Sequence, residues 1–146
     1  MAPRKIIRHM KPRHLILALL ALSMPLRADD EKKHPIDQAM EAAMERDSST
    51  AGMVRAVSKA NKDWDKEMND LYQDLKRKMK PEEWAALVAA QKAWIAYRDA
   101  QTKSIVETYG HIDGTMYIPM SASAVMELTK DRALFLKSFK ELISER

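Results

Sequence analysis

The sequence contains no cysteine and only three glycines among its 146 residues. Without cysteine the chain can form no disulfide, no thiolate nucleophile and no cysteine-based metal site. Glycine is nearly absent before Gly110 and Gly114, and no alternating run of apolar and polar residues reaches the length of a strand. The sequence therefore predicts an all-α fold, a small antiparallel bundle of about four helices.

Catalytic and metal-binding motifs are also lacking. The sequence has no nucleophile elbow, no glycine-rich phosphate loop and no H-E-x-x-H segment. Only His34 and His111 lie outside the first 28 residues, and a lone histidine is a weak signal for a metal ligand. We therefore expect no enzyme, no metal site and no cofactor, and we expect each histidine to cap a helix or to lie in a loop.

The first 28 residues have the pattern of an export signal. Five basic residues lie within residues 1–14, residues 15–22 form an unbroken apolar run, and the small residue Ala28 precedes Asp29. The apolar run is shorter than the roughly 20 residues needed to cross a bilayer, which favours cleavage over an uncleaved anchor. The sequence predicts a signal peptide ending at about Ala28, a single domain of residues 29–146, a periplasmic or secreted location and no stable membrane insertion after cleavage.

Removal of this leader reverses the net charge. The chain has 25 basic and 21 acidic residues, and residues 1–28 hold six of the basic ones and none of the acidic ones, so 19 basic residues remain against 21. The net charge changes from +4 to about −2. The remaining basic run at Lys76, Arg77 and Lys78 is typical of a solvated helix face. We expect neither nucleic acid nor an anionic membrane as a partner.

Proline positions and apolar spacing outline the first three helices. Pro35 begins a short helix, and Thr50 is expected to cap a second one. Pro81 ends the second helix and begins a third, which Gly110 is expected to stop as a left-handed cap. Because their connection is so short, the second and third helices are expected to pack antiparallel. The apolar stripe of the second helix is Met53, Val57, Ala60, Trp64, Met68, Leu71, Leu75 and Met79.

A fourth helix is predicted from Met116 or Ser121 to Ser144, after a loop at residues 110–115. Its expected inner face is Val125, Leu128, Arg132, Phe135, Phe139 and Leu142.

Polar residues interrupt the expected inner stripe of the third helix. Gln91 and Arg98 lie one heptad apart on it, where a buried polar group without a partner costs about 1–3 kcal/mol. Glu127, Glu67 and Asn69 are the expected partners of Arg98. An anion-binding or partner-binding pocket around Arg98 is the alternative hypothesis. The predicted structural network comprises Asn69, Gln91, Arg98, Glu127 and Arg132.

The aromatic residues divide into two groups. Trp64 and Trp94 fall on core-facing stripes, which predicts that they pack in the interior. Trp84 and Tyr97 are less constrained by the pattern, and aromatic residues are favoured at the centres of protein interfaces. These two residues are therefore candidate surface anchors for a protein partner.

Four segments along residues 29–146 carry a recognisable combination of residues. They are residues 34–37, 64–72, 90–100 and 127–132, and the most specific part combines Gln91, Trp94, Arg98 and Asp99. This combination resembles the LprI-like family of small exported helical proteins, which includes a lysozyme inhibitor. The resemblance implies an all-helical extracytoplasmic domain, with lysozyme inhibition as the activity known within the family.

The chain differs from this family in its lack of cysteine. Many relatives carry paired cysteines at the positions that align with Ala43, Ala56, Thr102 and Ala124, so disulfides that contribute about 2–5 kcal/mol each are absent here. The lipidated cysteine of the family lipoprotein is also missing. The resemblance therefore does not imply membrane anchoring.

Two functional hypotheses follow from the sequence and the resemblance. The first is an exported binding protein whose partner is lysozyme or another peptidoglycan hydrolase. Its candidate binding element is the loop around His111 and Asp113 with Tyr109 and Tyr117 beside it. The second is a periplasmic stress, assembly or immunity factor that binds a different protein through the side of the third helix that carries Trp84 and Tyr97.

Overall fold

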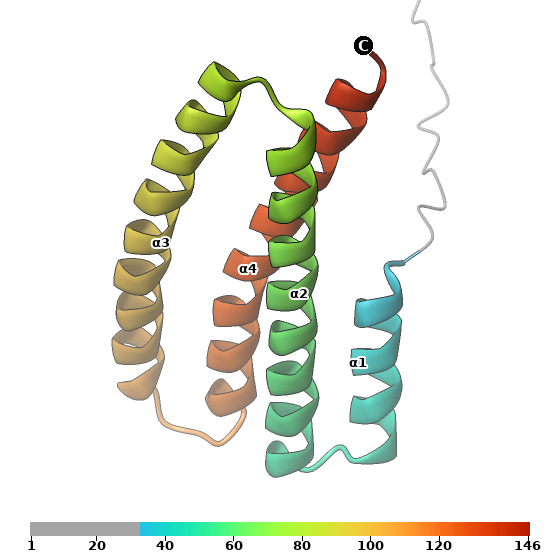
Figure 1. The fold of residues 1–146 in the computed structure, drawn as a ribbon. Coiled ribbons are helices and arrows are strands. Elements are labelled where there is room, and N and C mark those ends of the chain that lie inside the picture. Colours follow the sequence, from blue (N-terminus) through green and yellow to red (C-terminus); the bar gives the residue numbers. More distant parts are fainter. Residues whose placement is uncertain (1–32) are drawn as a thin grey trace, which may run out of the picture. The chain divides into compact units, whose positions relative to one another are not determined.

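The computed structural model describes residues 33–146, and the predicted export signal lies outside the described residues. Within them the chain forms four helices and no strand: α1 (Pro35–Arg46), α2 (Thr50–Lys78), α3 (Pro81–Gly110) and α4 (Tyr117–Ser144) (Figure 1). The all-α prediction is confirmed. None of these four helices combines the length and the apolar character that a bilayer crossing requires.

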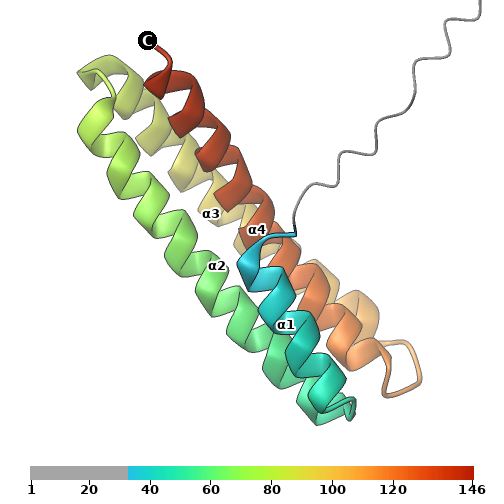
Figure 2. The same cartoon turned by 90° about the vertical axis from the view of Figure 1, so that its right-hand side faces the viewer.

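α2 and α4 lie side by side and run in the same direction (Figures 1 and 2). α1 packs against α2, α3 packs against α4, and both of these outer helices run in the opposite direction. α2 and α3 run antiparallel as predicted and meet through side chains such as Tyr72 and Trp84, but the backbone of α2 follows α4 more closely than it follows α3. The short connection at Met79 and Lys80 fixes only the near ends of α2 and α3, whereas complementary apolar faces decide which helices pack along their length.

The interface between α2 and α4 forms the core. Trp64 and Leu75 from α2 and Met126 and Leu136 from α4 are each at most 1% exposed. Burial of each of these side chains stabilises the fold by roughly 1.5–3 kcal/mol. The predicted stripe of α2 is confirmed over its central part. Its buried members are Val57, Ala60, Trp64, Met68, Leu71 and Leu75.

The inner face of α4 differs from the prediction by about one residue. The face against the core consists of Met126, Thr129, Ala133 and Leu136. Of the predicted positions, Phe135 and Leu142 are exposed, and Val125, Leu128, Arg132 and Phe139 are only half-buried. α4 contacts α2 on one side and α3 on another, so its apolar residues cover a wide arc. The apolar spacing on which the prediction was based instead marks the side of α4 that faces α3.

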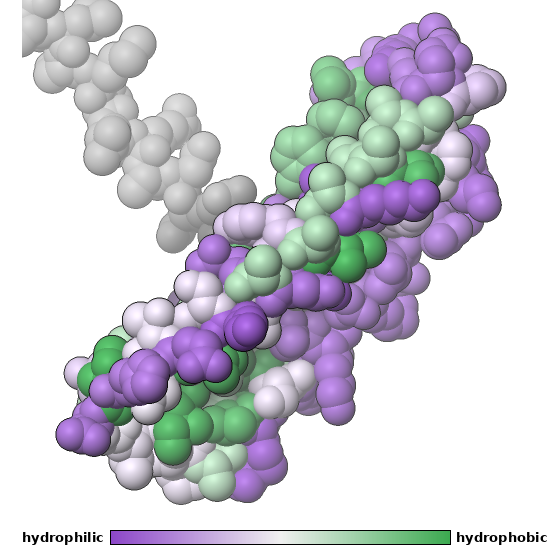
Figure 3. Space-filling model, turned by 90° about the vertical axis from the view of Figure 1, so that its left-hand side faces the viewer, coloured by the Kyte–Doolittle hydropathy of each residue, from purple (hydrophilic) through white to green (hydrophobic). Residues whose placement is uncertain are grey.

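α3 is the least buried of the three long helices. Leu87 and Gln91 are its buried residues, while Ile95, Tyr97 and Val106 are exposed. On the side of the molecule where α3 lies, apolar surface is interrupted by charged residues (Figure 3). Much of the apolar surface of α3 therefore has no partner among the described residues.

Two helix ends differ from the sequence prediction. Ser49, not Thr50, caps α2, because the Ser49 hydroxyl accepts a hydrogen bond from the backbone N–H of Gly52 at 3.0 Å. Gly110 is the last helical residue of α3 and does not adopt a left-handed conformation. The residue with positive φ is Gly114, at +120°, within the following loop.

We predict that alanine has opposite effects at Gly52 and Gly110. A Cβ atom at Gly52 would overlap both the carboxyl and the backbone carbonyl of Asp47, whereas a Cβ at Gly110 meets no atom within 4 Å. Gly52→Ala should lower the free energy of unfolding by about 1–3 kcal/mol. Gly110→Ala should leave it unchanged or raise it by up to about 1 kcal/mol. Urea unfolding measures both values, and equal effects of the two substitutions would contradict the packing described for Gly52.

A second interaction across the core interface is ionic. Lys140 on α4 donates a hydrogen bond to the Asp74 carboxylate on α2 at 2.5 Å, and Arg77 pairs with the same carboxylate. The hydrogen bond from Lys140, assisted by nearby positive charges, holds the pKa of the Asp74 carboxyl below its ordinary value. Such a group stabilises the folded state above its unfolded pKa of about 4, and the contribution is lost as the pH falls through the folded value.

The Asp74→Asn variant should therefore be less sensitive to acid than the wild type. Stability from urea unfolding at several pH values should decline more steeply for the wild type below about pH 4. Asp63→Asn is the matched control, because the partner of Asp63 is Lys59 on the same helix and not a residue of α4. A wild-type profile that is parallel to the Asp74→Asn profile would contradict the role of this ion pair.

Candidate functional site

The connection between α3 and α4 forms an exposed apolar tip at one end of the molecule. The loop projects beyond the packed helices (Figure 2). Ile112, Met116, Ile118 and Met120 are all exposed there, and Met116 retains 69% of its accessible surface. Grouped exposed apolar residues of this kind mark interaction surfaces in many proteins.

Two tyrosines and several hydrogen bonds fix the shape of this tip. The ring centroids of Tyr109 and Tyr117 lie 6.4 Å apart, at a tilt of 58°. The backbone N–H of Ile112 donates to the carbonyl of Tyr109 at 3.1 Å, and the N–H of Tyr117 donates to the carbonyl of Gly114 at 3.3 Å. These bonds hold a short loop in one shape, and a preformed loop loses less conformational entropy on binding.

Polar groups accompany the apolar residues at the tip. His111 and Asp113 are both exposed. A hollow of about 490 Å³ lies beside them, lined partly by Tyr109, Asp113 and Tyr117. The structure therefore places the four loop residues singled out by the sequence at one end of the bundle.

Trp84 and Tyr97 do not form one surface. Trp84 is half-buried at the start of α3, where its ring lies 4.7 Å from that of Tyr72 on α2. Tyr97 is 54% exposed and lies about 20 Å further along the helix. Trp84 thus bridges α2 and α3, and Tyr97 alone is available to a partner.

One bond of the predicted polar network joins α3 to α4. Arg132 Nε donates to Gln91 Oε1 at 2.9 Å, and Gln91 Nε2 lies 3.9 Å from the sulfur of Met68. The Arg132 guanidinium lies 5.8 Å from the ring centroid of Trp94 and 5.2 Å from that of Phe135. Burial lowers the pKa of this guanidinium. Gln91 and Arg132 are therefore bonded directly across the helix interface.

The remaining three residues of that network form no hydrogen bond with Gln91 or Arg132. Arg98 pairs with its neighbour Asp99 at 2.8 Å and rests over the ring of Trp94. Asn69 donates to the backbone carbonyl of Asp65 at 2.8 Å. Glu127 lies 3.6 Å from Lys130.

The expected pairing of Arg98 with Glu127, Glu67 or Asn69 is wrong. Asn69 and Arg98 line the same hollow between α2 and α3, but each bonds to a residue of its own helix, Asn69 to Asp65 and Arg98 to Asp99. Glu127 instead pairs with Lys130, which also bonds to Asp37 of α1. Arg98 is consequently a half-buried surface residue and not the centre of a buried network.

Sequence reasoning missed a buried charge cluster that holds α1. Asp37 is 8% exposed and accepts hydrogen bonds from Trp64 Nε1 at 3.3 Å and from Lys130 Nζ at 2.9 Å. The cluster thereby joins α1, α2 and α4. The sequence could have indicated this cluster, because Asp37 is a polar residue on the same helix face as the apolar Met40 and Met44.

His34 and Lys130 complete this cluster. The His34 ring stacks on Trp64 with centroids 4.3 Å apart, and its Nδ1 accepts from the N–H of Ile36, so His34 caps α1 as expected. Burial acts to lower the pKa of Lys130. The hydrogen bond to Asp37 and the charges of Glu127 and Asp37 together outweigh burial, so the pKa of Lys130 lies above its ordinary value.

The described residues hold no group of three or more acidic or histidine side chains placed to bind a metal ion. The exposed residues at the tip offer hydrogen bonding and apolar contact. Both are properties of a binding surface.

Comparisons with known proteins place the chain in a family. The family model described as lysozyme inhibitor LprI matches residues 40–136. The chain belongs to the LprI family. The LprI match includes the projecting loop and the bond between Gln91 and Arg132, whereas Asp37 lies just before its first residue.

One solved structure and the curated proteins complete these comparisons. The crystal structure of an uncharacterized protein from Burkholderia thailandensis is 28% identical to this chain, with a TM-score of 0.72. The match covers 77% of this chain and 56% of that one, so this LprI-family chain corresponds to little more than half of its relative. The comparison with curated proteins gave no match.

We predict that loss of the Asp37 carboxylate weakens the attachment of α1 to α2 and α4. Asp37→Asn removes the charge opposite Lys130, whose side chain is 22% exposed. Breaking a fully buried ion pair costs about 3–5 kcal/mol, so a loss near 2 kcal/mol is expected at this partly exposed one. Asp70→Asn, in the exposed pair with Lys66, should change the unfolding free energy by less than about 1 kcal/mol.

Chemical denaturation with tryptophan fluorescence as the probe measures the unfolding free energy of both variants. Equal stability of Asp37→Asn and the wild type would contradict the role assigned to this cluster.

Proposed function

We propose that this protein is an extracytoplasmic inhibitor of a lysozyme-type peptidoglycan hydrolase and that it acts by binding. The observation that carries the proposal is the projecting apolar tip between α3 and α4, in a chain that belongs to the LprI family. A binding role fits the lack of catalytic motifs in the sequence. The export pattern of residues 1–28 supports the proposed location.

The tip suits the active-site cleft of a lysozyme. Such a cleft uses two carboxyl groups on either side of the scissile bond, one of them a protonated acid. His111 can donate or accept hydrogen bonds, and the exposed backbone of the loop offers further donors and acceptors. An inserted loop that bonds to these carboxyl groups blocks the substrate and requires no chemistry of its own.

The apolar residues at the tip supply the binding energy. Ile112 and Met116 are exposed in the free protein and would be buried against the walls of the cleft. Tyr109 and Tyr117 stand behind the loop, and aromatic residues in that position are typical of interface centres. The hydrogen bonds that hold the loop reduce the conformational entropy lost on binding.

A lysis assay with tip variants tests the proposal. The wild-type protein, purified after export, should slow the lysis of bacterial cell walls by lysozyme. Met116→Ser and His111→Ala should each raise the half-inhibitory concentration about tenfold, which corresponds to a loss of about 1.4 kcal/mol. Tyr109→Ala should weaken inhibition through loss of the support behind the loop.

Leu134→Ser is the matched control, because Leu134 is an exposed residue of α4 outside the tip. This control should inhibit as well as the wild type. Unchanged lysis in the presence of a micromolar excess of wild-type protein would overturn the proposal.

The exposed Tyr97 supports a second candidate, a stress, assembly or immunity factor with a partner other than lysozyme. Tyr97 and Ile95 are exposed on α3 away from the tip. Affinity capture with the wild type and with Tyr97→Ala separates the two functions. A partner other than a peptidoglycan hydrolase that is lost with Tyr97→Ala, but retained with Met116→Ser, would favour this candidate.

A further inference from the structure

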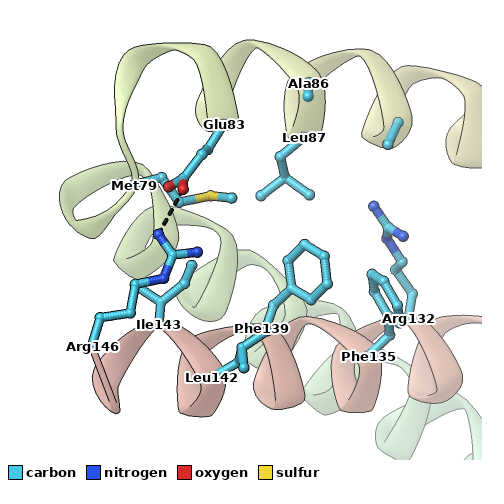
Figure 4. A pocket seen from close by; sticks show the side chains of 11 residues that line it. Met79, Glu83, Ala86, Leu87, Arg132, Phe135, Phe139, Leu142, Ile143 and Arg146 are labelled. Carbon is cyan, nitrogen blue, oxygen red and sulfur yellow. Dashed lines mark hydrogen bonds and ion pairs between the residues drawn. The ribbon is translucent and has the colours of Figure 1, made fainter.

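A second site lies between α3 and the C-terminal half of α4. A groove of about 390 Å³ separates the two helices there (Figure 4). Its walls are almost wholly apolar. They include Ala86, Leu87 and Ala90 from α3 and Phe135, Phe139 and Leu142 from α4.

Charges lie at the two ends of this groove. At one end Arg146 donates to the Glu83 carboxylate at 2.6 Å, so that each neutralises the other (Figure 4). Arg132 lines the other end. The groove is therefore apolar along its length, neutral at one end and positively charged at the other.

The positive charge of Arg132 is not balanced by a carboxylate within residues 33–146. Arg132 forms no ion pair there, and its Nε donates to an uncharged amide, that of Gln91. Its Nη2 atom is shielded from solvent and has no hydrogen-bond acceptor among these residues. A guanidinium in partly apolar surroundings gains stability from an anion that supplies both the charge and the acceptor.

We propose that this groove binds a long-chain carboxylate, with its hydrocarbon chain along the apolar walls and its head group against the guanidinium of Arg132. The volume lies at the lower end of the range for small-molecule sites. The position of the unpaired guanidinium specifies an anionic head at one end of an apolar chain. The exposed ring of Phe135 lies 5.2 Å from the guanidinium and borders the position proposed for the head group.

This site is independent of the lysozyme-binding tip. The groove is built from the part of α4 that follows Arg132 and from the first turns of α3, whereas the tip is the opposite end of both helices. Ligand binding in the groove therefore neither requires nor excludes inhibition of a hydrolase.

Calorimetric titration of the exported protein with laurate and with dodecanol tests the proposal. The two probes have the same hydrocarbon chain and differ in the charge of the head group. Laurate, kept below its micelle concentration, should bind at least ten times more tightly than dodecanol. Equal affinity for the two probes, or no detectable binding of laurate, would overturn the proposal.

Two pairs of variants locate the site. Arg132→Gln should reduce laurate affinity at least tenfold, to the level of dodecanol. Lys137→Gln is its control, because it makes the same charge change at an exposed position of α4 outside the groove. Ala90→Phe should fill the groove and abolish binding of both probes. Ala89→Phe, at a neighbouring position that does not line the groove, should have no effect.

The thermal unfolding of each variant shows whether it is folded, and Ala90→Phe tests the site even if Arg132→Gln is unstable. Laurate binding that survives Ala90→Phe would contradict the assignment. Sedimentation that reveals a wild-type dimer, dissociated by Ala90→Phe, would assign the groove to a second copy of the chain and overturn the proposal. Met116→Ser should bind laurate normally, so failure of the lysozyme hypothesis leaves this test intact.

Discussion

The apolar contact between α2 and α4 is the interaction on which the other parts of the structure depend. It places two long helices side by side and leaves each with one further face. α1 attaches to this pair through Asp37, which bonds to Trp64 of α2 and to Lys130 of α4. α3 attaches through a narrower contact with α4, reinforced by the bond between Gln91 and Arg132.

The position of α3 shapes both proposed binding surfaces. Its first turns leave an apolar groove against α4, and its last turn leads into the loop at the tip. No disulfide ties α3 to another helix. Helix packing and polar bonds alone therefore set the positions of the groove and of the loop in this member of the LprI family.

Features that depend on the spacing of residues within one helix were predicted from the sequence. Features that depend on which helices pack against each other were missed. The stripe that contains Trp64 was predicted correctly because its apolar residues recur at regular helical spacing along α2. The inner face of α4 was displaced because α4 carries apolar residues both toward α2 and toward α3, so regular spacing alone could not show that Phe135 faces a groove. The partner of Arg98 depended on which helices pack together, and Asp37 was missed although its helix face carried the signal.

The central functional claim is that the α3–α4 tip enters the cleft of a lysozyme-type hydrolase. Amide hydrogen exchange, measured on the exported protein with and without lysozyme, tests it most directly. We expect slower exchange over residues 109–120 in the complex and unchanged exchange around Tyr97. Protection confined to the exposed side of α3, with the tip unaffected, would contradict it.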